Sequence, residues 1–192
     1  MDIERLTADT EDFTGEVWHI KEINTLVDAG TGDSWGEIKE LDDVDTVLLT
    51  HSHYDHVDNL GKIVDKFSPT VYAYAPENLA FDAEKVSEGD NIEIKNIEFK
   101  VFHTPGHKDD SVCFYSESEK ILFAGDLLFP DGGFGRTDLE EGNRDLLIKS
   151  IEKISELDVE RMYTGHGEAV KENTNQQIMR SLEEAKMHEA KY

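Results

Sequence analysis

Thr50-His51-Ser52-His53-Tyr54-Asp55-His56 places three imidazoles and one carboxylate within six consecutive positions, 51–56. Imidazole and carboxylate groups are ligands that zinc and similar divalent metals take in proteins. A lone histidine of this kind could be a surface accident or part of a core hydrogen-bond network. So dense a set gains nothing for folding if it stands in water without a partner. The stretch therefore predicts one half of a metal site.

The sequence on either side predicts where this stretch lies in the fold. Residues 46–49 are apolar and β-prone, and the apolar residues after the stretch recur at helical spacing. We therefore expect a loop that joins a strand to a helix. His51 and His53 point to the same side of an extended backbone, which suits one ion. Asp55 can cap the helix and His56 can open it, so that both turn toward a second ion.

Size and charge bound the class of protein. The chain has 192 residues and a formal net charge of −24, with 43 acidic against 19 basic residues. One domain over residues 1–192 fits this length. Such an acidic field repels phosphate backbones, so we expect a small-molecule substrate and no nucleic-acid partner. The acidic surface fits a high-salt cytoplasm and an ordinary acidic cytosolic enzyme equally well.

Cysteine usage and the N-terminus indicate a cytoplasmic protein. Cys113 is the single cysteine, which excludes an intramolecular disulfide, and its strand-like surroundings predict a buried structural thiol. The first residues lack a basic segment followed by an apolar run, and no apolar stretch approaches the length of a membrane span. We expect cytoplasmic residence and no membrane partner.

Hydrophobic patterning predicts strands in two sets, each followed by helices. Strands are expected at residues 16–20, 24–29, 46–49, 70–74, 92–94, 97–101, 112–115, 121–124 and 161–164. Helices are expected at residues 57–67, 76–81, 144–157 and from 174 to the C-terminus, with a brief helix or turn at 35–44. Two such sets are typical of two sheets packed face to face with helices outside.

Further ligand-type residues stand where predicted strands run into turns. His107 follows Thr104-Pro105-Gly106, Asp126 follows a glycine, and His166 lies between two glycines. Glycine beside each candidate lets other backbone approach closely. Asp28 ends an apolar strand before a glycine turn, where a carboxylate either caps the turn or orients a metal-bound histidine. Two other histidines are expected to be surface or partly buried residues: His19 and His188.

This set of motifs resembles the metallo-β-lactamase superfamily of hydrolases, in that family's order and over most of the chain. The matching motifs are Asp28 after a strand, His51-x-His53-x-Asp55-His56, Thr104-Pro105-Gly106-His107, Gly125-Asp126 and Gly165-His166-Gly167. The resemblance implies an α+β fold, a four-layer αββα sandwich with the site along one edge of the two sheets. It also implies that His51, His53 and His107 hold one ion, that Asp55, His56 and His166 hold the other, and that Asp126 bridges them.

Two divalent ions would supply the chemistry without a serine or cysteine nucleophile. The pKa of water falls to about 7 at a zinc-like ion, and the resulting hydroxide can attack a thioester carbonyl. Asp55 and Asp126 are expected to help orient this hydroxide, and Asp28 to hold a liganding imidazole. Zinc is the expected metal, although mixed histidine and aspartate ligation also suits iron and manganese.

A stretch near the second set of motifs narrows the resemblance. Gly133-Phe134-Gly135-Arg136-Thr137-Asp138 is similar to the glyoxalase II group and its single-domain relatives, which implies hydrolysis of lactoyl-thiol compounds. We expect Arg136 to hold a substrate carboxylate, because a guanidinium binds one through two parallel hydrogen bonds. An ordinary surface salt bridge is the other interpretation. The same stretch also resembles persulfide dioxygenases, which use one iron in this fold, and lactonases share nearly the same motifs.

Departures from the glyoxalase II pattern disfavour glutathione as the natural thiol. Residues 167–169 lack the aromatic side chain that often assists thiol-substrate binding there, and Lys108-Asp109-Asp110 replaces small neutral residues and places two carboxylates near the site. The sequence also stops soon after the last motif. We therefore expect it to lack the helical C-terminal domain that contributes glutathione contacts in longer glyoxalase II enzymes.

Overall fold

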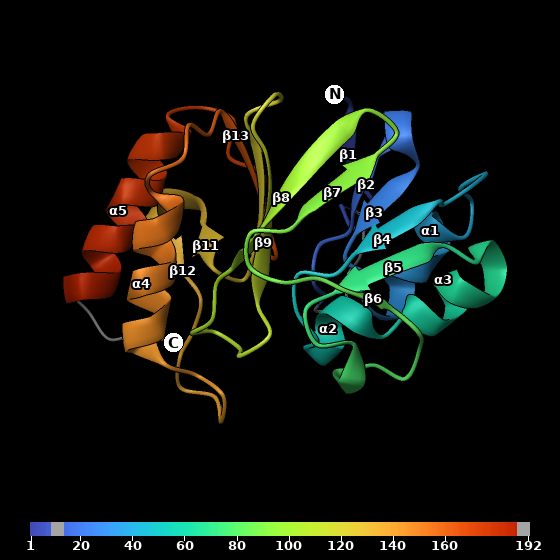
Figure 1. Ribbon diagram of the computed structural model, residues 1–192, viewed down its shortest axis with the longest axis horizontal. Helices are drawn as coiled ribbons and strands as arrows, with labels where there is room; N and C mark the ends of the chain where they lie inside the picture. Colours follow the sequence, from blue (N-terminus) through green and yellow to red (C-terminus); the bar gives the residue numbers. More distant parts are fainter. Residues whose placement is uncertain (9–13, 188–192) are drawn as a thin grey trace. The chain divides into compact units, whose positions relative to one another are not determined.

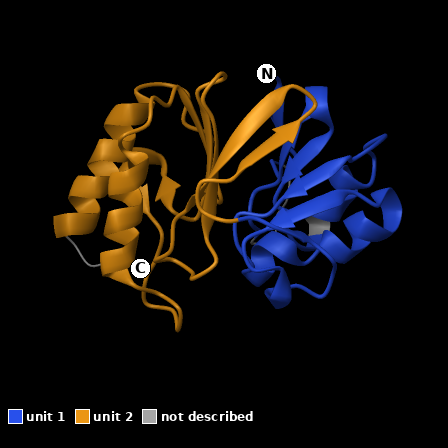
Figure 2. Cartoon of the chain, viewed as in Figure 1, with its two compact units in different colours: residues 1–86 blue, residues 87–192 orange. Residues whose placement is uncertain are grey.

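A computed structural model describes residues 1–8 and 14–187, and the chain divides into two compact units, Met1–Val86 and Ser87–Tyr192 (Figures 1 and 2). Each unit contains one principal sheet with helices packed on it. The single domain expected over residues 1–192 stays a prediction, and His188 lies outside the described residues. None of the helices in the described ranges is both long and apolar enough to cross a membrane.

The first unit is built on a six-stranded sheet in the order β1-β2-β3-β4-β5-β6. Its strands are β1 (Ile3–Arg5), β2 (Trp18–Ile20), β3 (Thr25–Val27), β4 (Thr46–Leu48), β5 (Thr70–Ala73) and β6 (Glu84–Lys85). The pairs from β1 to β3 are antiparallel, and those from β3 to β6 are parallel. Because β3 and β4 run the same way, the residues that follow them emerge at one edge. Asp28 there donates its backbone N–H to the Leu48 carbonyl at 2.9 Å.

Apolar residues of this sheet pack against helices α1 (Trp35–Ile38) and α3 (Leu60–Phe67). Leu26 of β3 and Val47 of β4 are fully buried on the same core as Leu60 and Ile63 of α3. Three short 3₁₀ helices complete the connections: η1 (Lys21–Ile23), η2 (Gly32–Ser34) and η3 (Pro76–Asn78). The predicted helix at 76–81 is therefore a single 3₁₀ turn.

The predicted helix over residues 57–67 is two helices, α2 (Tyr54–Val57) and α3. Asn59 causes the interruption, because it is completely buried and its polar groups are used elsewhere. Its backbone N–H donates to the Gly30 carbonyl at 3.2 Å, and its side-chain amide donates to Ser34 Oγ at 2.9 Å. Helix α2 begins at Tyr54, so the expectation that Asp55 caps the helix and His56 opens it was wrong: Asp55 lies inside the first turn.

The second unit is built on a five-stranded sheet in the order β13-β10-β9-β8-β7. Its strands are β7 (Asn91–Ile94), β8 (Ile97–His103), β9 (Val112–Ser116), β10 (Ile121–Gly125) and β13 (Arg161–Thr164). The pair β10 and β13 is parallel, and the other pairs are antiparallel. The residues after β10 and β13 therefore also meet at one edge, where Gly165 donates its N–H to the Gly125 carbonyl at 2.8 Å.

Helices α4 (Arg144–Ile154) and α5 (Thr174–Met187) pack on one face of this sheet. Leu147 and Ile151 of α4 share a buried cluster with Leu122 of β10 and Ile178 of α5. Cys113 of β9 is completely buried in the same cluster, and burial raises the pKa of its thiol to about 12. A thiol in this state is a structural apolar group, as predicted.

The sequence patterns missed the shortest elements. In the first unit these are β1 and β6. In the second unit they are η4 (Pro130–Gly132) and a small hairpin of β11 (Leu128–Phe129) and β12 (Gly133–Phe134). These pieces have two or three residues each, too few for either periodicity to emerge.

His19 of β2 is buried rather than near the surface, with 8% of the residue exposed. Both of its ring nitrogens are buried without a hydrogen-bond partner among the described residues. Burial lowers the pKa of this imidazole, although Glu4, its cross-strand partner on β1, acts in the opposite direction. The folded state therefore favours the neutral ring, and it loses stability as the pH falls below the unfolded value of about 6.5.

We predict that His19→Leu raises the free energy of unfolding at pH 8 by about 1 kcal/mol, since it removes unpartnered buried polar atoms. The advantage over the wild type should widen by up to about 1.4 kcal/mol per pH unit below pH 6.5. Urea unfolding of both proteins at pH 8.0, 6.5 and 5.5 measures the difference between their free energies of unfolding. The contributions of the other titrating groups are the same in both proteins and cancel in this difference. An advantage that stays constant or shrinks as the pH falls would contradict the assignment.

Candidate metal centre

The first pair of ligand-type atoms lies in the loop after β4. His51 Nε2 and His53 Nδ1 are 3.1 Å apart, with the two rings edge to face at 4.8 Å between centroids. Two nitrogens bound tetrahedrally to one zinc at about 2.0–2.1 Å would be roughly 3.3 Å from each other. The alternation of an extended backbone thus brings these two nitrogens together, as predicted, at a spacing that suits a shared ion.

Asp28 orients histidines of the first unit through hydrogen bonds. Its Oδ1 accepts the Thr50 backbone N–H at 2.7 Å, and its Oδ2 accepts the Thr50 hydroxyl at 2.7 Å. The same Oδ2 lies 2.8 Å from His56 Nδ1, and the carboxylate is 2% exposed. An ionised carboxylate only accepts hydrogen bonds, so His56 Nδ1 carries the proton and Nε2 is left as the donor atom for a metal.

The same assignment of hydrogen-bond donors and acceptors determines the tautomer of His51. The Thr50 hydroxyl donates its only proton to Asp28, so toward His51 Nδ1, at 3.1 Å, it acts as the acceptor. His51 Nδ1 therefore carries a proton, and its Nε2 faces His53. Asp28 thus orients His56 directly and His51 through Thr50. This buried carboxylate therefore sets the tautomers of two predicted ligands.

The second pair of the first unit consists of Asp55 and His56. His56 Nε2 lies 3.6 Å from Asp55 Oδ2, and the histidine is completely buried whereas the Asp55 side chain is 20% exposed. The two rings of His51 and His56 lie 4.1 Å apart between centroids. The helical turn of α2 therefore directs a carboxylate oxygen and an imidazole nitrogen to one position, although Asp55 is not its cap.

The second unit brings together the remaining three predicted ligands, with His107 and His166 both close to Asp126. Asp126 Oδ2 lies 3.4 Å from His107 Nε2 and also 3.4 Å from His166 Nε2. Asp126 follows β10 and His166 follows its parallel neighbour β13, which explains why residues far apart in sequence meet. One carboxylate oxygen is therefore equally close to two imidazole nitrogens, and the bridging role of Asp126 stays a prediction.

His107 is fixed by main chain on both sides. Its Nδ1 lies 2.9 Å from the Arg136 carbonyl oxygen, which can only accept, so Nδ1 is protonated and Nε2 faces Asp126. The preceding Gly106 has φ +136° and packs directly on the backbone of α4 at Leu147, where any side chain would clash. Gly106 also accepts the N–H of Asn143, the N-cap of α4, at 2.7 Å. The helix thereby anchors the turn that carries His107.

The side chain of Arg136 forms a bidentate ion pair with Asp138. Nε to Oδ1 and Nη2 to Oδ2 are both 2.7 Å, on a guanidinium that is 45% exposed. The hydrogen bonds from Arg136 lower the pKa of Asp138 to about 2. Nearby, the buried Lys108 pairs with Glu141 at 2.5 Å. The Arg136 guanidinium, which is expected to hold a substrate carboxylate, therefore already binds the carboxylate of Asp138.

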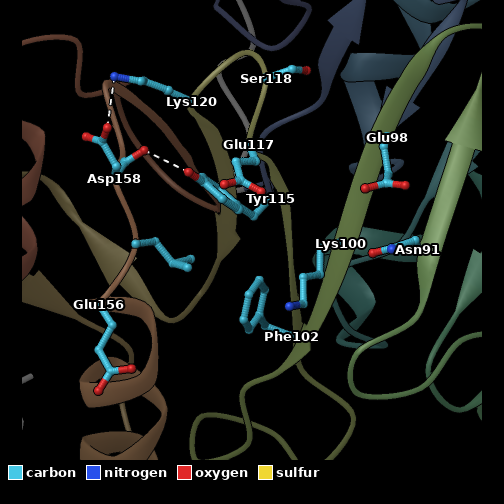
Figure 3. A pocket seen from close by; sticks show the side chains of 11 residues that line it. Asn91, Glu98, Lys100, Phe102, Tyr115, Glu117, Ser118, Lys120, Glu156 and Asp158 are labelled. Atoms are coloured by element: carbon cyan, nitrogen blue, oxygen red, sulfur yellow. Dashed lines mark hydrogen bonds and ion pairs between the residues drawn. The ribbon is translucent and has the colours of Figure 1, made fainter.

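A separate groove of about 950 Å³ lies on the second unit (Figure 3). Phe102 and Tyr115 lie along it, and at one end Lys120 and the Tyr115 hydroxyl both bind Asp158 at 2.8 Å. Its lining includes none of the predicted ligands, so this groove is not the candidate metal centre.

Sequence reasoning found the ligand-type residues but missed part of what holds them. The sequence patterns did not predict that Thr50, the Arg136 carbonyl and Gly15 hold or contact these ligands. A Cβ built on Gly15 would lie 2.8 Å from three atoms of the His56 ring. The position of Thr50, a hydroxyl residue directly before His51, was the one feature of the sequence that could have indicated its hydrogen bond to that histidine.

Paired imidazole and carboxylate atoms at the strand ends of both units define an α+β protein with histidine and aspartate clusters suited to divalent metals. Residues 17–166 match the family model of the metallo-β-lactamase superfamily. The chain therefore belongs to the metallo-β-lactamase superfamily, as its motifs predicted, and it has that family's α+β fold.

Individual relatives agree with this assignment. A hydroxyacylglutathione hydrolase from Francisella philomiragia is 39% identical over 116 residues, which are 60% of this chain and 46% of that protein. The chain thus spans about half the length of this curated relative. Among solved structures, the BLEG-1 B3 metallo-β-lactamase has a TM-score of 0.76 at 26% identity, covering 93% of this chain and 96% of that one. TTHA1623 in a di-iron-bound form has a TM-score of 0.70 at 25% identity, covering 82% and 89%.

Proposed function

We propose that the chain is a metal-dependent hydrolase of thioesters whose two half-sites together hold two divalent ions. In this proposal His51, His53 and His107 hold one ion, Asp55, His56 and His166 hold the other, and Asp126 bridges them. The observation that carries it is the equal separation of 3.4 Å between Asp126 Oδ2 and the Nε2 atoms of His107 and His166, one predicted ligand of each ion. The Asp55 and His56 pair and the His51 and His53 pair supply the complementary ligands.

Divalent ions bound by these residues would lower the pKa of a water to about 7 and polarise a substrate carbonyl. The chain's own residues do the rest. Asp55 and Asp126 accept hydrogen bonds from the attacking water and so orient it. Asp28 keeps Nδ1 of His56 protonated, and through Thr50 that of His51, so that their Nε2 atoms stay available. Zinc is the proposed metal, with iron or manganese as alternatives, since all three accept such ligands.

The substrate class rests on the resemblance to glyoxalase II and on the hydroxyacylglutathione hydrolases among the relatives. A lactoyl thioester is the proposed substrate, and the protein is proposed to act in the cytoplasm. Lys108-Asp109-Asp110, in place of small neutral residues, supports a thiol carrier other than glutathione. Lys108 of this stretch is buried and pairs with the exposed Glu141. A one-iron persulfide dioxygenase and a lactonase are the competing activities within the same fold.

Release of free thiol from a panel of acyl thioesters, including lactoylglutathione, tests the proposal. Metal-replete protein should turn over at least one of them, and His53→Ala should not. If no thioester is cleaved although metal is bound, the thioesterase proposal fails. Oxygen uptake with a glutathione persulfide would then support the dioxygenase, and ring opening of a lactone panel would support the lactonase.

Arg136 is proposed to release Asp138 and bind the substrate carboxylate. We predict that Arg136→Ala raises KM about tenfold while kcat changes less than twofold, because a bidentate pair contributes to ground-state and transition-state binding alike. The backbone carbonyl that holds His107 is retained in this variant. Asp138→Asn, which removes the internal competitor, should lower KM. Steady-state kinetics decide: unchanged KM in both variants would make the pair a surface salt bridge only.

A further inference from the structure

Gly15 lies against the ring of a predicted metal ligand. It belongs to the connection between β1 and β2, and its backbone N–H donates to the Asp55 carbonyl at 2.9 Å. A Cβ at this position would lie 2.8 Å from Cε1, Nδ1 and Nε2 of His56 alike. Equal distances to three ring atoms mean that the added carbon would sit over the face of the imidazole. Only the absence of a side chain lets the backbone cover that face.

The His56 ring has no room to move away. It is completely buried, its Nδ1 is held by Asp28 at 2.8 Å, and the His51 ring lies at 4.1 Å between centroids. Asp28 is itself held by two hydrogen bonds from Thr50. Any displacement of the ring would therefore break this hydrogen-bond chain or redirect Nε2.

The backbone at Gly15 is equally constrained. On one side, the buried Glu16 accepts two hydrogen bonds from Arg5, at 2.6 and 2.5 Å, and another from Thr7. On the other side, Thr14 Oγ1 accepts the Thr31 N–H at 2.8 Å and donates to the Gly15 carbonyl at 3.0 Å. The segment cannot retreat from His56 without breaking these contacts. Because φ of Gly15 is not in the left-handed region, alanine would meet a contact and not a backbone strain.

We propose that Gly15 is a positioning residue for one of the two ions, the one assigned to Asp55, His56 and His166. It holds Asp55 by a main-chain hydrogen bond and sets the plane of the His56 imidazole by direct packing. The ion assigned to His51, His53 and His107 is expected to be affected less, because Asp28 orients His51 only through Thr50. This inference rests on the proposed function, because it takes the two ligand sets from there.

The test compares zinc binding by wild type, Gly15→Ala and Gly36→Ala. Gly36 lies in α1, and a Cβ there would meet nothing within 4 Å, so it controls for the added methyl group. Competition with a chromophoric chelator resolves the two affinities, and the d–d spectrum of the cobalt-substituted protein reports ligand geometry. Gly15→Ala should weaken one ion 10- to 100-fold and alter its cobalt spectrum. The other ion and both ions of Gly36→Ala should stay within twofold of the wild type.

Folding is controlled by a second variant. If Gly15→Ala unfolds, the double variant Gly15→Ala with His56→Ala should be folded, because the new methyl group then occupies the space of the missing ring. Equal loss of both ions in a folded Gly15→Ala, or wild-type binding of both, would overturn the inference, as would a double variant no more stable than Gly15→Ala. A wild type that binds fewer than two ions would instead refute the proposed function.

Discussion

Asp126→Ala is expected to lower kcat/KM for thioester hydrolysis by about 10³-fold or more. The residue is proposed to contact both ions, and several kilocalories per mole of transition-state stabilisation depend on bound metal, where about 4 kcal/mol corresponds to 10³ in rate. The loss should be accompanied by weaker binding of both ions, since Asp126 Oδ2 lies equally close to His107 and His166. Steady-state thiol release and metal analysis of the dialysed variant measure the two effects.

Asp145→Ala is the matched control for Asp126→Ala. It removes an exposed carboxylate of the same unit, from the first turn of α4. Activity and metal content should stay near the wild-type values. If Asp126→Ala retains full activity while Asp145→Ala behaves as the wild type, the proposed bridging role is refuted.

Asp28→Asn should weaken binding of the ion held by His56 by about 10- to 100-fold, although residue 28 would not touch the ion. Asparagine suits the left-handed backbone of this position, where φ is +63°, so the backbone is not disturbed. Its single carbonyl oxygen must serve the Thr50 backbone N–H, which leaves the NH₂ group facing His56 Nδ1. His56 would then have to carry its proton on Nε2, the atom required for the metal.

The same substitution should lower the free energy of unfolding by about 1–3 kcal/mol, because buried donors lose their acceptor. Asp45→Asn is the control, since Asp45 is exposed and accepts from Asn24 at the surface. Zinc competition and urea unfolding of both variants separate the two effects. Metal affinity within twofold of the wild type in folded Asp28→Asn would show that the carboxylate does not set the tautomer of His56.

Much of the fold followed from alternation and helical spacing. Apart from β1 and β6, the strands of both sheets and the helices α3, α4 and α5 were predicted within a few residues, because each buries an apolar face long enough to show a periodicity. The break between α2 and α3 was not predictable, since it depends on the contacts of Asn59 with Gly30 and Ser34, well away in sequence. The cap of α2 lies at His53 and not at Asp55, which the sequence pattern also did not predict.

The ligand-type residues were visible because each stands where a strand ends. Parallel pairing of β3 with β4 and of β10 with β13 explains why such ends gather in space. The groups that hold the ligand-type residues in place were harder to predict from the sequence. The Arg136 carbonyl acts through main chain, which carries no residue signature, and Gly15 acts through a missing side chain 41 positions from His56. His19 was misjudged because one histidine between apolar neighbours does not reveal which face of the strand is covered.

Metal stoichiometry tests the central claim most directly. The intact protein, stripped with a chelator and dialysed against dilute zinc, should retain two ions per chain by mass spectrometric metal analysis. His53→Ala and His166→Ala should each lose affinity for a different ion, because they belong to different ligand sets. A folded wild-type protein that retains one ion or none would contradict the account.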